Sequence, residues 1–441
     1  MSPAPATADP AAEDGPRDAV TPPSLLVCTE CAQPHRWVDL APSRLARCSR
    51  CDAVVARGHR LDAQALLALT VAALIVFLIA NSANLITISL RGADVSTTVP
   101  MAIAAAWRDD ARLVAVLAAI TAVIAPAAFI ALRLLVLVPL VVQRRVPPWM
   151  GLTMRLLHAS GRWNTVSVLA IGALLSLVRI ADLAQASAGA GLVALGGLAI
   201  LLAAIESAGL RHLWAEQEPP RPIEVSAGSR RWLGCECCGW VGTVADETGP
   251  PVSCPRCGHP IEHSRQLGLQ RTWALLFAAL VLFIPANLMP MMSTTQALRE
   301  TPHTLIGGIV ELWHAGAIGL AVLVFVASIV VPLVKIGALA VLAWSVNHAS
   351  QWRRVERARL YRLIEAVGHW SMLDVYVVVL LVGMVRFGNL ASASSGPGLL
   401  AFAAVVVLTM LATHDFDPRW IWQSRPSRRR STGNRSPGMS A

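Results

Sequence analysis

The sequence predicts an all-α polytopic membrane protein made of two parallel tandem repeats, with eight transmembrane helices in total. Composition is the first reason. Of the 441 residues, 55% are hydrophobic and only 15% are charged, whereas soluble domains carry about 25% charged residues. The second reason is a series of long apolar segments. The third is that cysteine, tryptophan and proline positions recur at a nearly constant shift along the chain.

Eight apolar segments approach or exceed the length of about 20 residues that a helix needs to cross a bilayer. They cover residues 65–88, 111–142, 163–184, 189–213, 272–292, 315–346, 368–390 and 396–414. Two segments are longer than a span requires and contain proline: Pro126 and Pro139 in one, Pro332 in the other. We therefore expect kinks or tilt in these two helices.

Arginine placement predicts the orientation of the chain. Basic clusters precede the first segment, separate the second from the third, follow the fourth, separate the sixth from the seventh, and follow the eighth. With eight spans, all of these clusters lie on one side, which the positive-inside rule assigns to the cytoplasm. Both termini are then cytoplasmic, and the net charge of +10 requires no nucleic-acid partner.

Residues 1–23 lack the apolar core of a signal peptide.

The chain is an internal duplication. Cys28 and Cys235 are 207 residues apart, and Trp107 and Trp313 are 206 apart. Other pairs at one of these two shifts are Cys48 and Cys254, Pro126 and Pro332, Trp163 and Trp370, and Arg179 and Arg386. An even number of spans in each repeat makes the two repeats parallel, related by a pseudo-twofold axis along the membrane normal.

Each repeat begins with two Cys-x-x-Cys pairs. Such doublets offer four thiolates to one ion, the arrangement of a structural zinc ribbon. The predicted ligands are Cys28, Cys31, Cys48 and Cys51 in the first ribbon and Cys235, Cys238, Cys254 and Cys257 in the second. Redox pairs or disulfides are the alternative, although cytoplasmic thiols stay reduced. The ninth cysteine, Cys237, is either a free thiol or an alternative ligand.

These features divide the chain into six parts. The predicted order is a disordered tail (1–23), zinc ribbon 1 (24–60), a four-helix transmembrane domain (61–215), a linker with zinc ribbon 2 (216–265), a second four-helix domain (266–422) and a disordered basic tail (423–441). In each repeat, a small β-structured cytoplasmic ribbon thus precedes four transmembrane helices.

Two charges lie inside predicted spans, Lys335 in the sixth and Asp374 in the seventh. A charge at membrane depth is costly and marks a candidate functional residue. At the repeat shift, Lys335 corresponds to Phe129 and Asp374 to Ser167, so this pair belongs to the second repeat alone. The alternative is an ion pair that only fixes helix packing.

Three hydroxyls complete the candidate network: Ser328, Ser371 and Thr409. Together with Lys335 and Asp374 they could exchange protons, because burial and mutual attraction tune such groups. Serine and threonine in spans also bond to their own backbone, which is the alternative for each hydroxyl. The sequence contains no Walker motif, nucleophile elbow or zinc-protease motif, so we expect no enzymatic activity.

Four stretches carry a family resemblance: PANLMPMM at 285–292, ASIVVPLVK at 327–335, GHWSMLDVY at 368–376 and FDPRWIW at 416–422. With the two cysteine doublets, they resemble the paraquat-inducible protein A family (PqiA/LetA-like). The resemblance implies a bacterial inner-membrane protein and a periplasmic MCE-domain partner whose rings form a lipid tunnel. It also implies that the family's polar intramembrane positions fall on Ser328, Lys335, Ser371, Asp374 and Thr409.

Three functions follow from these observations. The first is a subunit of an MCE-type system that moves lipids between inner and outer membrane and is driven by the proton gradient. The second is a passive anchor that loads lipid into the MCE tunnel protein. The third is a redox or metal-sensing membrane protein that uses the cysteines.

Overall fold

A computed structural model describes most of the chain. The described residues are 25–36, 40–41, 44–58, 61–90, 93–109, 111–181, 185–208, 230–245, 252–261, 264–296, 299–348, 350–384, 386–387 and 391–423. The predicted tail at 1–23, the predicted tail at 423–441 except for Gln423, and the linker residues 216–229 lie outside them. Among the described residues, eight helices are long and apolar enough to cross a membrane, which confirms the predicted polytopic fold.

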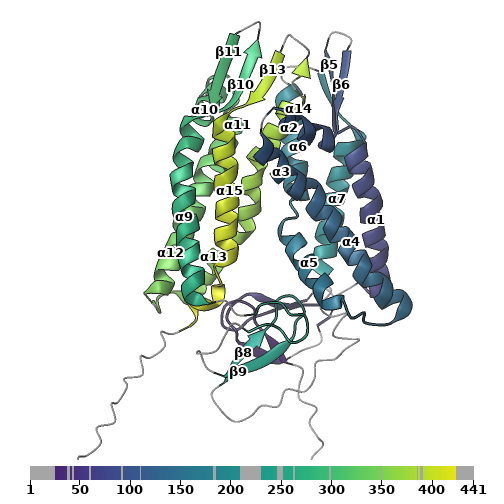
Figure 1. Cartoon of the computed structure of the whole chain (residues 1–441), viewed down its shortest axis with the longest axis vertical. Helices are drawn as coiled ribbons and strands as arrows, with labels where there is room; N and C mark the ends of the chain where they lie inside the picture. Colours follow the sequence, from purple (N-terminus) through teal and green to yellow (C-terminus); the bar gives the residue numbers. More distant parts are fainter. Residues whose placement is uncertain are drawn as a thin grey trace, which may run out of the picture.

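The α-helices follow the same order in the two repeats, and the π-helix η1 of the first corresponds to η3 of the second (Figure 1). The first has α1 (Ala63–Ser82), α2 (Val99–Arg108), α3 (Arg112–Ala118), η1 (Ala119–Ile124), α4 (Ala125–Val138), η2 (Pro139–Gln143), α5 (Met150–Arg162), α6 (Val166–Ala181) and α7 (Ala190–Ala208). The second has α9 (Arg265–Leu288), α10 (Leu305–His314), α11 (Ile318–Phe325), η3 (Val326–Val330), α12 (Val331–Asn347), α13 (Arg354–Gly368), η4 (His369–Met372), α14 (Leu373–Met384), α15 (Pro397–Asp415) and η5 (Pro418–Ile421).

The predicted irregularities at proline are π-helical turns. Pro126 follows the π-helix η1, and Pro332 follows the π-helix η3. Proline has no N–H, so the carbonyl four residues earlier loses its helical partner, and the backbone widens locally. The irregularity recurs at the repeat shift, and η3 contains the candidate residue Ser328.

The third and seventh spans begin earlier than predicted. The predicted starts were residues 163 and 368, but helix begins at Met150 and at Arg354. The arginine-rich segments read as loops are helices α5 and α13, whose apolar residues Met154 and Leu157, and Tyr361 and Ile364, are buried at helical spacing. A short break at Trp163–Thr165 and the 3₁₀ turn η4 then join them to α6 and α14.

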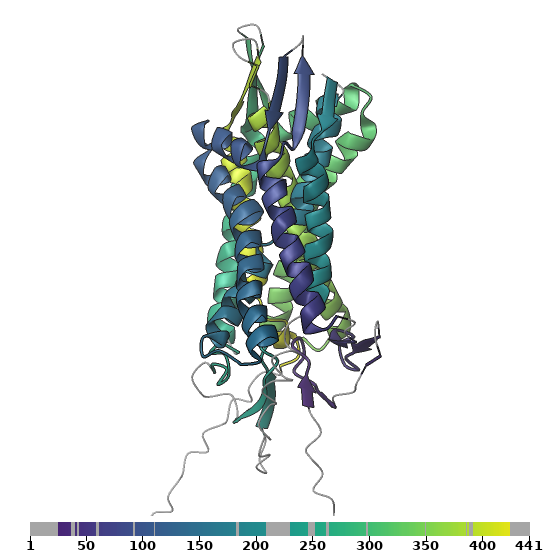
Figure 2. The ribbon, with the colours of Figure 1, turned by 90° about the vertical axis from the view of Figure 1, so that its right-hand side faces the viewer.

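Two small sheets, absent from the predicted fold, cover the end of the bundle opposite the ribbons (Figures 1 and 2). One has the strand order β6-β5-β7 and the other β11-β10-β13-β12, with all neighbours antiparallel. Their strands are β5 (Ile86–Leu90), β6 (Ala93–Thr97), β7 (Gln185–Ala188), β10 (Pro290–Gln296), β11 (Arg299–Thr304), β12 (Arg386–Phe387) and β13 (Ala391–Ser395).

Packing is also duplicated. Helix α1 packs on α7 and on α4 in the first repeat, as α9 packs on α15 and on α12 in the second. The repeats meet where α14 packs against its counterpart α6. Gly172 of α6 permits this close approach, because a Cβ there would lie 3.3 Å from Cβ of Tyr376. Helix α14 also packs against α2 and α3 of the first repeat.

Candidate functional site

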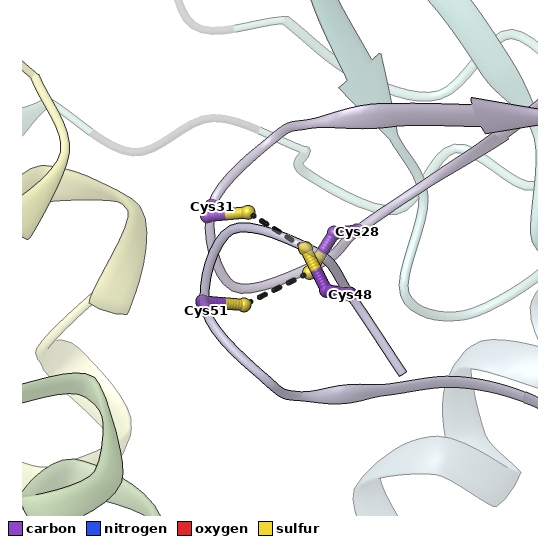
Figure 3. Close-up of side chains that lie close together, drawn as sticks. All are labelled: Cys28, Cys31, Cys48 and Cys51. Atoms are coloured by element: carbon purple, nitrogen blue, oxygen red, sulfur yellow. Dashed lines mark hydrogen bonds between the residues drawn. The ribbon is translucent and has the colours of Figure 1, made fainter. Parts of the chain in front are cut away.

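Each repeat brings its four predicted cysteine ligands together. The sulfur atoms of Cys28, Cys31, Cys48 and Cys51 lie within 4.8 Å of one another, as do those of Cys235, Cys238, Cys254 and Cys257. Figure 3 shows that the first four converge on one point, with the Sγ atoms of Cys31 and Cys48 at 3.5 Å. A disulfide bond is about 2.05 Å long, whereas sulfurs of a tetrahedral zinc site stand about 3.8 Å apart. All eight are free, buried cysteines, so both centres are built for a metal ion.

The four Cys-x-x-Cys turns share one backbone conformation. In each turn the residue after the second cysteine is left-handed: Ala32 (φ 58°), Asp52 (φ 63°), Gly239 (φ 73°) and Gly258 (φ 70°). Its N–H donates to the carbonyl of the first cysteine, at 2.8–3.0 Å. Short antiparallel strands flank the turns: β1 (Leu25–Val27), β2 (Pro34–Arg36), β3 (Leu45–Arg47) and β4 (Val54–Arg57) in ribbon 1 (residues 25–57), and β8 (Arg230–Gly234) and β9 (Val241–Ala245) in ribbon 2 (residues 230–261).

The pKa values of the clustered thiols also indicate that a bound cation would stabilise each cluster. Hydrogen bonds from Cys31 and Cys51 lower the pKa of Cys28 to about 4, while the bond to Cys28 raises the pKa of Cys31. In ribbon 2, the pKa of Cys254 is lowered and that of Cys238 is raised by the thiols around them. One thiolate in each cluster thus suppresses ionisation of a neighbour, and a divalent ion would remove that repulsion.

Ribbon 1 docks on the second repeat. Arg362 of α13 forms an ion pair with Glu30 and donates to the carbonyl of Cys51 at 3.2 Å. Ala358, one turn earlier on α13, is fully buried against the four cysteines of the ribbon. Arg50 lies over the ring of Trp422, with its Cζ 4.7 Å from the ring centroid.

Ribbon 2 docks in the same way on the first repeat. Arg155 of α5, 207 residues before Arg362, donates to the carbonyl of Gly258 at 3.4 Å. Gly151, 207 before Ala358, lies so close to ribbon 2 that a Cβ there would be 3.1 Å from Cα of Cys257. Each ribbon therefore binds the arginine-rich helix of the opposite repeat. The ribbons also touch each other, because a Cβ on Gly234 would lie 3.1 Å from Cβ of Val27.

Cys237, the spare thiol, is buried beside the second metal centre and forms a hydrogen bond with Cys257. The four sulfurs that converge in ribbon 2 are those of the two predicted pairs.

Lys335 points from α12 toward the end of α13. It is only 3% exposed, and its Nζ lies 3.1 Å from the position of a Cβ on Gly368. At the repeat shift, the ring of Phe129 lies against Gly161 in the same way. A Cβ placed on Gly161 would lie 3.5 Å from Cε2 of Phe129. Lys335 and Phe129 thus occupy equivalent places. Among the described residues, Lys335 Nζ has no hydrogen-bond partner.

The segments that carry the other candidates converge near Lys335. Segment η3, with Ser328, packs against η4, with Ser371, and against α14; α12 packs against α15, with Thr409. Ser328, Ser371 and Thr409 are all buried. The Ser371 hydroxyl has no partner among the described residues, whereas Thr409 donates to the carbonyl of Val406 in its own helix at 2.9 Å.

Asp374 is the second residue of α14, and its side chain lies outside the described part of the structure. Its pairing with Lys335 therefore stays a prediction. The described atoms of the network that need a partner are Lys335 Nζ and Ser371 Oγ. Such orphaned buried atoms are rare in proteins and demand an explanation.

Sequence analysis missed a buried cation in the first repeat. Arg133 in α4 is 3% exposed, and its Cζ lies 5.1 Å above the ring centroid of Phe129. Its Nε and Nη1 have no hydrogen-bond partner among the described residues, and Glu206 of α7 lies within electrostatic reach. The first repeat therefore also holds a cation near the place of Lys335. The signal was present, since Arg133 interrupts the apolar run 111–142.

A second missed feature joins the two repeats. The hydroxyl of Tyr376 on α14 donates to Thr121 of η1 at 2.6 Å and lies 2.5 Å from Oγ1 of Thr165. All three side chains are buried. A sequence gives no sign that residues 211 and 255 positions apart will meet.

Comparisons with known proteins agree with this architecture. The model of the family "Paraquat-inducible protein A" matches residues 63–218 and 269–425, one match in each repeat. No solved structure matches the chain.

Several curated relatives are similar over different lengths. "Intermembrane transport protein PqiA" of Escherichia coli K12 is 29% identical over 91% of this chain and 96% of its own length. "Lipophilic envelope-spanning tunnel protein A" of the same organism is 31% identical over 60% of this chain and 61% of its own length. A "Probable intermembrane transport protein" of Haemophilus influenzae is 39% identical over 39% and 41%. With both repeats matched and both cysteine clusters in place, the chain belongs to the paraquat-inducible protein A family.

Proposed function

We propose that the protein is an inner-membrane subunit of an MCE-type system that moves lipids between the inner and outer membranes. Relatives named for intermembrane transport and for an envelope-spanning lipophilic tunnel support this role, as do the eight apolar helices. Its partners are then a periplasmic MCE-domain protein and membrane lipids. The protein transports and does not catalyse a reaction.

The proton gradient drives this transport through Lys335 and its neighbours. The single observation that carries this step is the buried Nζ of Lys335, which has no described hydrogen-bond partner. A buried amine without a partner favours its neutral form, and an approaching carboxylate favours the charged form. Asp374, six residues past Gly368, supplies that carboxylate. Protonation of the pair then controls how α12 packs against the α13–α14 helix.

The test is the double variant Lys335→Met, Asp374→Leu. Removing both charges with apolar side chains of similar size is often neutral for stability, whereas removing one leaves an unpaired charge at a cost of about 3–5 kcal/mol. We expect the double variant to insert and keep its metal, yet to lose at least tenfold in lipid transfer from proteoliposomes with an imposed proton gradient. Thr70→Val, which removes a buried hydroxyl of α1, is the control and should transfer lipid normally.

Two results separate the alternatives. Normal lipid transfer by the double variant would show that Lys335 and Asp374 serve only to pack the helices. Transfer that persists after the proton gradient is collapsed would favour a passive anchor that loads lipid into the MCE protein. A redox role is disfavoured because the eight sulfurs lie in two sets of four, each set within 4.8 Å, and all eight are free cysteines.

Both ribbons hold structural zinc. Each would supply four thiolates to one Zn²⁺, the ion that suits a closed tetrahedral sulfur set. Metal analysis of purified protein is expected to find two zinc ions per chain, and acidification should release them as the thiolates are protonated. An intact, folded protein without bound metal would disprove this assignment.

A further inference from the structure

A cavity unrelated to the Lys335 network lies between the last turn of α12 and the first turn of α13. Its volume is about 510 Å³, within the range of small-molecule sites. Its apolar side includes Val341, Trp344, Trp352 and Leu360, and its polar side includes Arg353 and Arg357. It lies at the end of the bundle where the ribbons sit (Figure 1).

Arg357 is the unusual residue of this cavity. It is only 6% exposed, and its Nη2 donates to the carbonyl of Ser350 at 2.7 Å. Its Nε and Nη1 are buried and have no hydrogen-bond partner among the described residues. The two N–H groups point in different directions, because Nη1 lies on the Cδ side of the guanidinium and the Nε–H on the other, so each can donate a separate hydrogen bond to an oxyanion. A buried guanidinium with unpaired N–H groups is costly unless an anion reaches it.

The surrounding groups favour an anion at the same point. Arg353 adds a second positive charge, partly balanced by Glu356 at 3.2 Å. Helix α13 begins at Arg354, so the positive end of its dipole also faces the cavity.

The apolar side indicates what is attached to the anion. Trp344 is 59% exposed and Trp352 is 69% exposed, and both stand at an end of the membrane-spanning bundle. Tryptophan is enriched at this depth because its ring matches the boundary between acyl chains and headgroups. A free phosphate would use none of this apolar wall, whereas a glycerophospholipid would place its glycerol and upper acyl chains against it.

The site belongs to the second repeat alone. At the repeat shift, Arg357 corresponds to Met150, an apolar side chain that is 1% exposed. The scaffold therefore tolerates a buried methionine here, and the arginine is not needed to form the helix.

We propose that this cavity binds the phosphodiester of a glycerophospholipid, with Arg357 holding the phosphate and Trp344, Val341 and Leu360 contacting the glycerol and acyl chains. The binding site does not depend on the proposed transport function. With the predicted orientation of the chain, the site faces the cytoplasmic leaflet of the membrane.

Binding can be measured on the purified, metal-loaded protein in detergent, by native mass spectrometry. The probe is dihexanoyl phosphatidylglycerol, compared with dihexanoylglycerol, which lacks the phosphate, and with inorganic phosphate. We expect saturable binding of the phospholipid, and at least tenfold weaker binding of the other two. Arg357→Met should weaken phospholipid binding at least tenfold. The matched control Arg354→Gln, a neighbouring arginine outside the cavity lining, should change it less than twofold.

Two results would overturn the proposal: unchanged binding by Arg357→Met, or inorganic phosphate binding as tightly as the phospholipid. If Arg357→Met lowers the folded yield, Leu360→Trp fills the cavity with Arg357 in place and must also abolish binding. Lipid transfer is not part of this measurement. A failure of the proton-coupling proposal for Lys335 would therefore not contradict this binding site. A failure to bind phospholipid here would likewise not contradict the coupling proposal.

Discussion

At the scale of single residues, the two ribbons reach the same backbone shape from different side chains. Ribbon 2 has glycine at both left-handed positions, but ribbon 1 has Ala32 and Asp52. A left-handed residue other than glycine costs about 1–2 kcal/mol, while glycine loses about 0.4–1 kcal/mol through the freedom of the unfolded chain. The strain of a left-handed non-glycine residue exceeds the entropy cost of glycine. We therefore expect ribbon 1 to bind its metal less tightly than ribbon 2.

We predict that Ala32→Gly stabilises ribbon 1 by about 0.5–1 kcal/mol, which corresponds to about two- to fivefold tighter metal retention. Competition with a zinc chelator, monitored at each ribbon separately, measures the change. Gly239→Ala is the matched variant at the equivalent position of ribbon 2 and should weaken retention there. Equal retention by wild-type protein and Ala32→Gly would show that the turn carries no strain.

The residue scale also shows what a sequence can and cannot provide. The cysteine spacing predicted both metal centres, because four thiols in two short turns have few other arrangements. Lys335 was found because a charge in an apolar run is conspicuous, and Arg133 should have been found for the same reason. The contact of Tyr376 with Thr121 and Thr165 depends on how two distant helices face each other, which no local pattern encodes.

At the scale of elements, the crossed docking of the ribbons rests on two equivalent small residues, Gly151 and Ala358. Gly151 has no room for a side chain, since a Cβ would meet backbone atoms of Cys257 at 3.1 and 3.3 Å. The cysteine backbone cannot yield without moving its metal-binding turn.

We predict that Gly151→Val detaches ribbon 2 from α5 while the ribbon keeps its metal. Hydrogen exchange of residues 254–258 should then rise at least tenfold, with unchanged metal content. Ala358→Gly is the reciprocal control. It should cost about 1 kcal/mol of helix propensity but leave ribbon 1 docked. Unchanged exchange in Gly151→Val would mean that this contact does not hold the ribbon.

The elements that sequence analysis missed have physical reasons. Strands β5 and β10 follow Ser-Ala-Asn84-Leu and Pro-Ala-Asn287-Leu without a polar break, so their first residues extended the predicted spans to 88 and 292. Helices α5 and α13 were hidden by their arginines, which suggested loops. Apolar length therefore predicted how many helices cross the membrane more accurately than where each one ends.

At the scale of the whole molecule, both described ends of the chain lie at the ribbon end of the bundle, because the chain starts in β1 of ribbon 1 and Trp422 contacts Arg50 of the same ribbon. An even number of spans requires this arrangement. Together with the arginine-rich helices α5 and α13 at the same end, it supports the orientation with the ribbons in the cytoplasm.

We predict that reporter fusions after residues 150 and 352 report cytoplasm and that a fusion near residue 300, in β11, reports periplasm. A cytoplasmic signal near residue 300, or a periplasmic signal at either other point, would contradict the parallel arrangement of the repeats.

The crossed docking also has a consequence for how the protein is made. Glu30 and its partner Arg362 are 332 residues apart, and translation proceeds at about 5–20 residues per second. Ribbon 1 leaves the ribosome first, but the helix it docks on, α13, is synthesised only roughly 15–65 s later. With the proposed zinc bound, its four thiolate bonds hold ribbon 1 folded during that interval, so cells short of zinc are expected to lose the nascent chain to proteolysis before the second repeat is inserted.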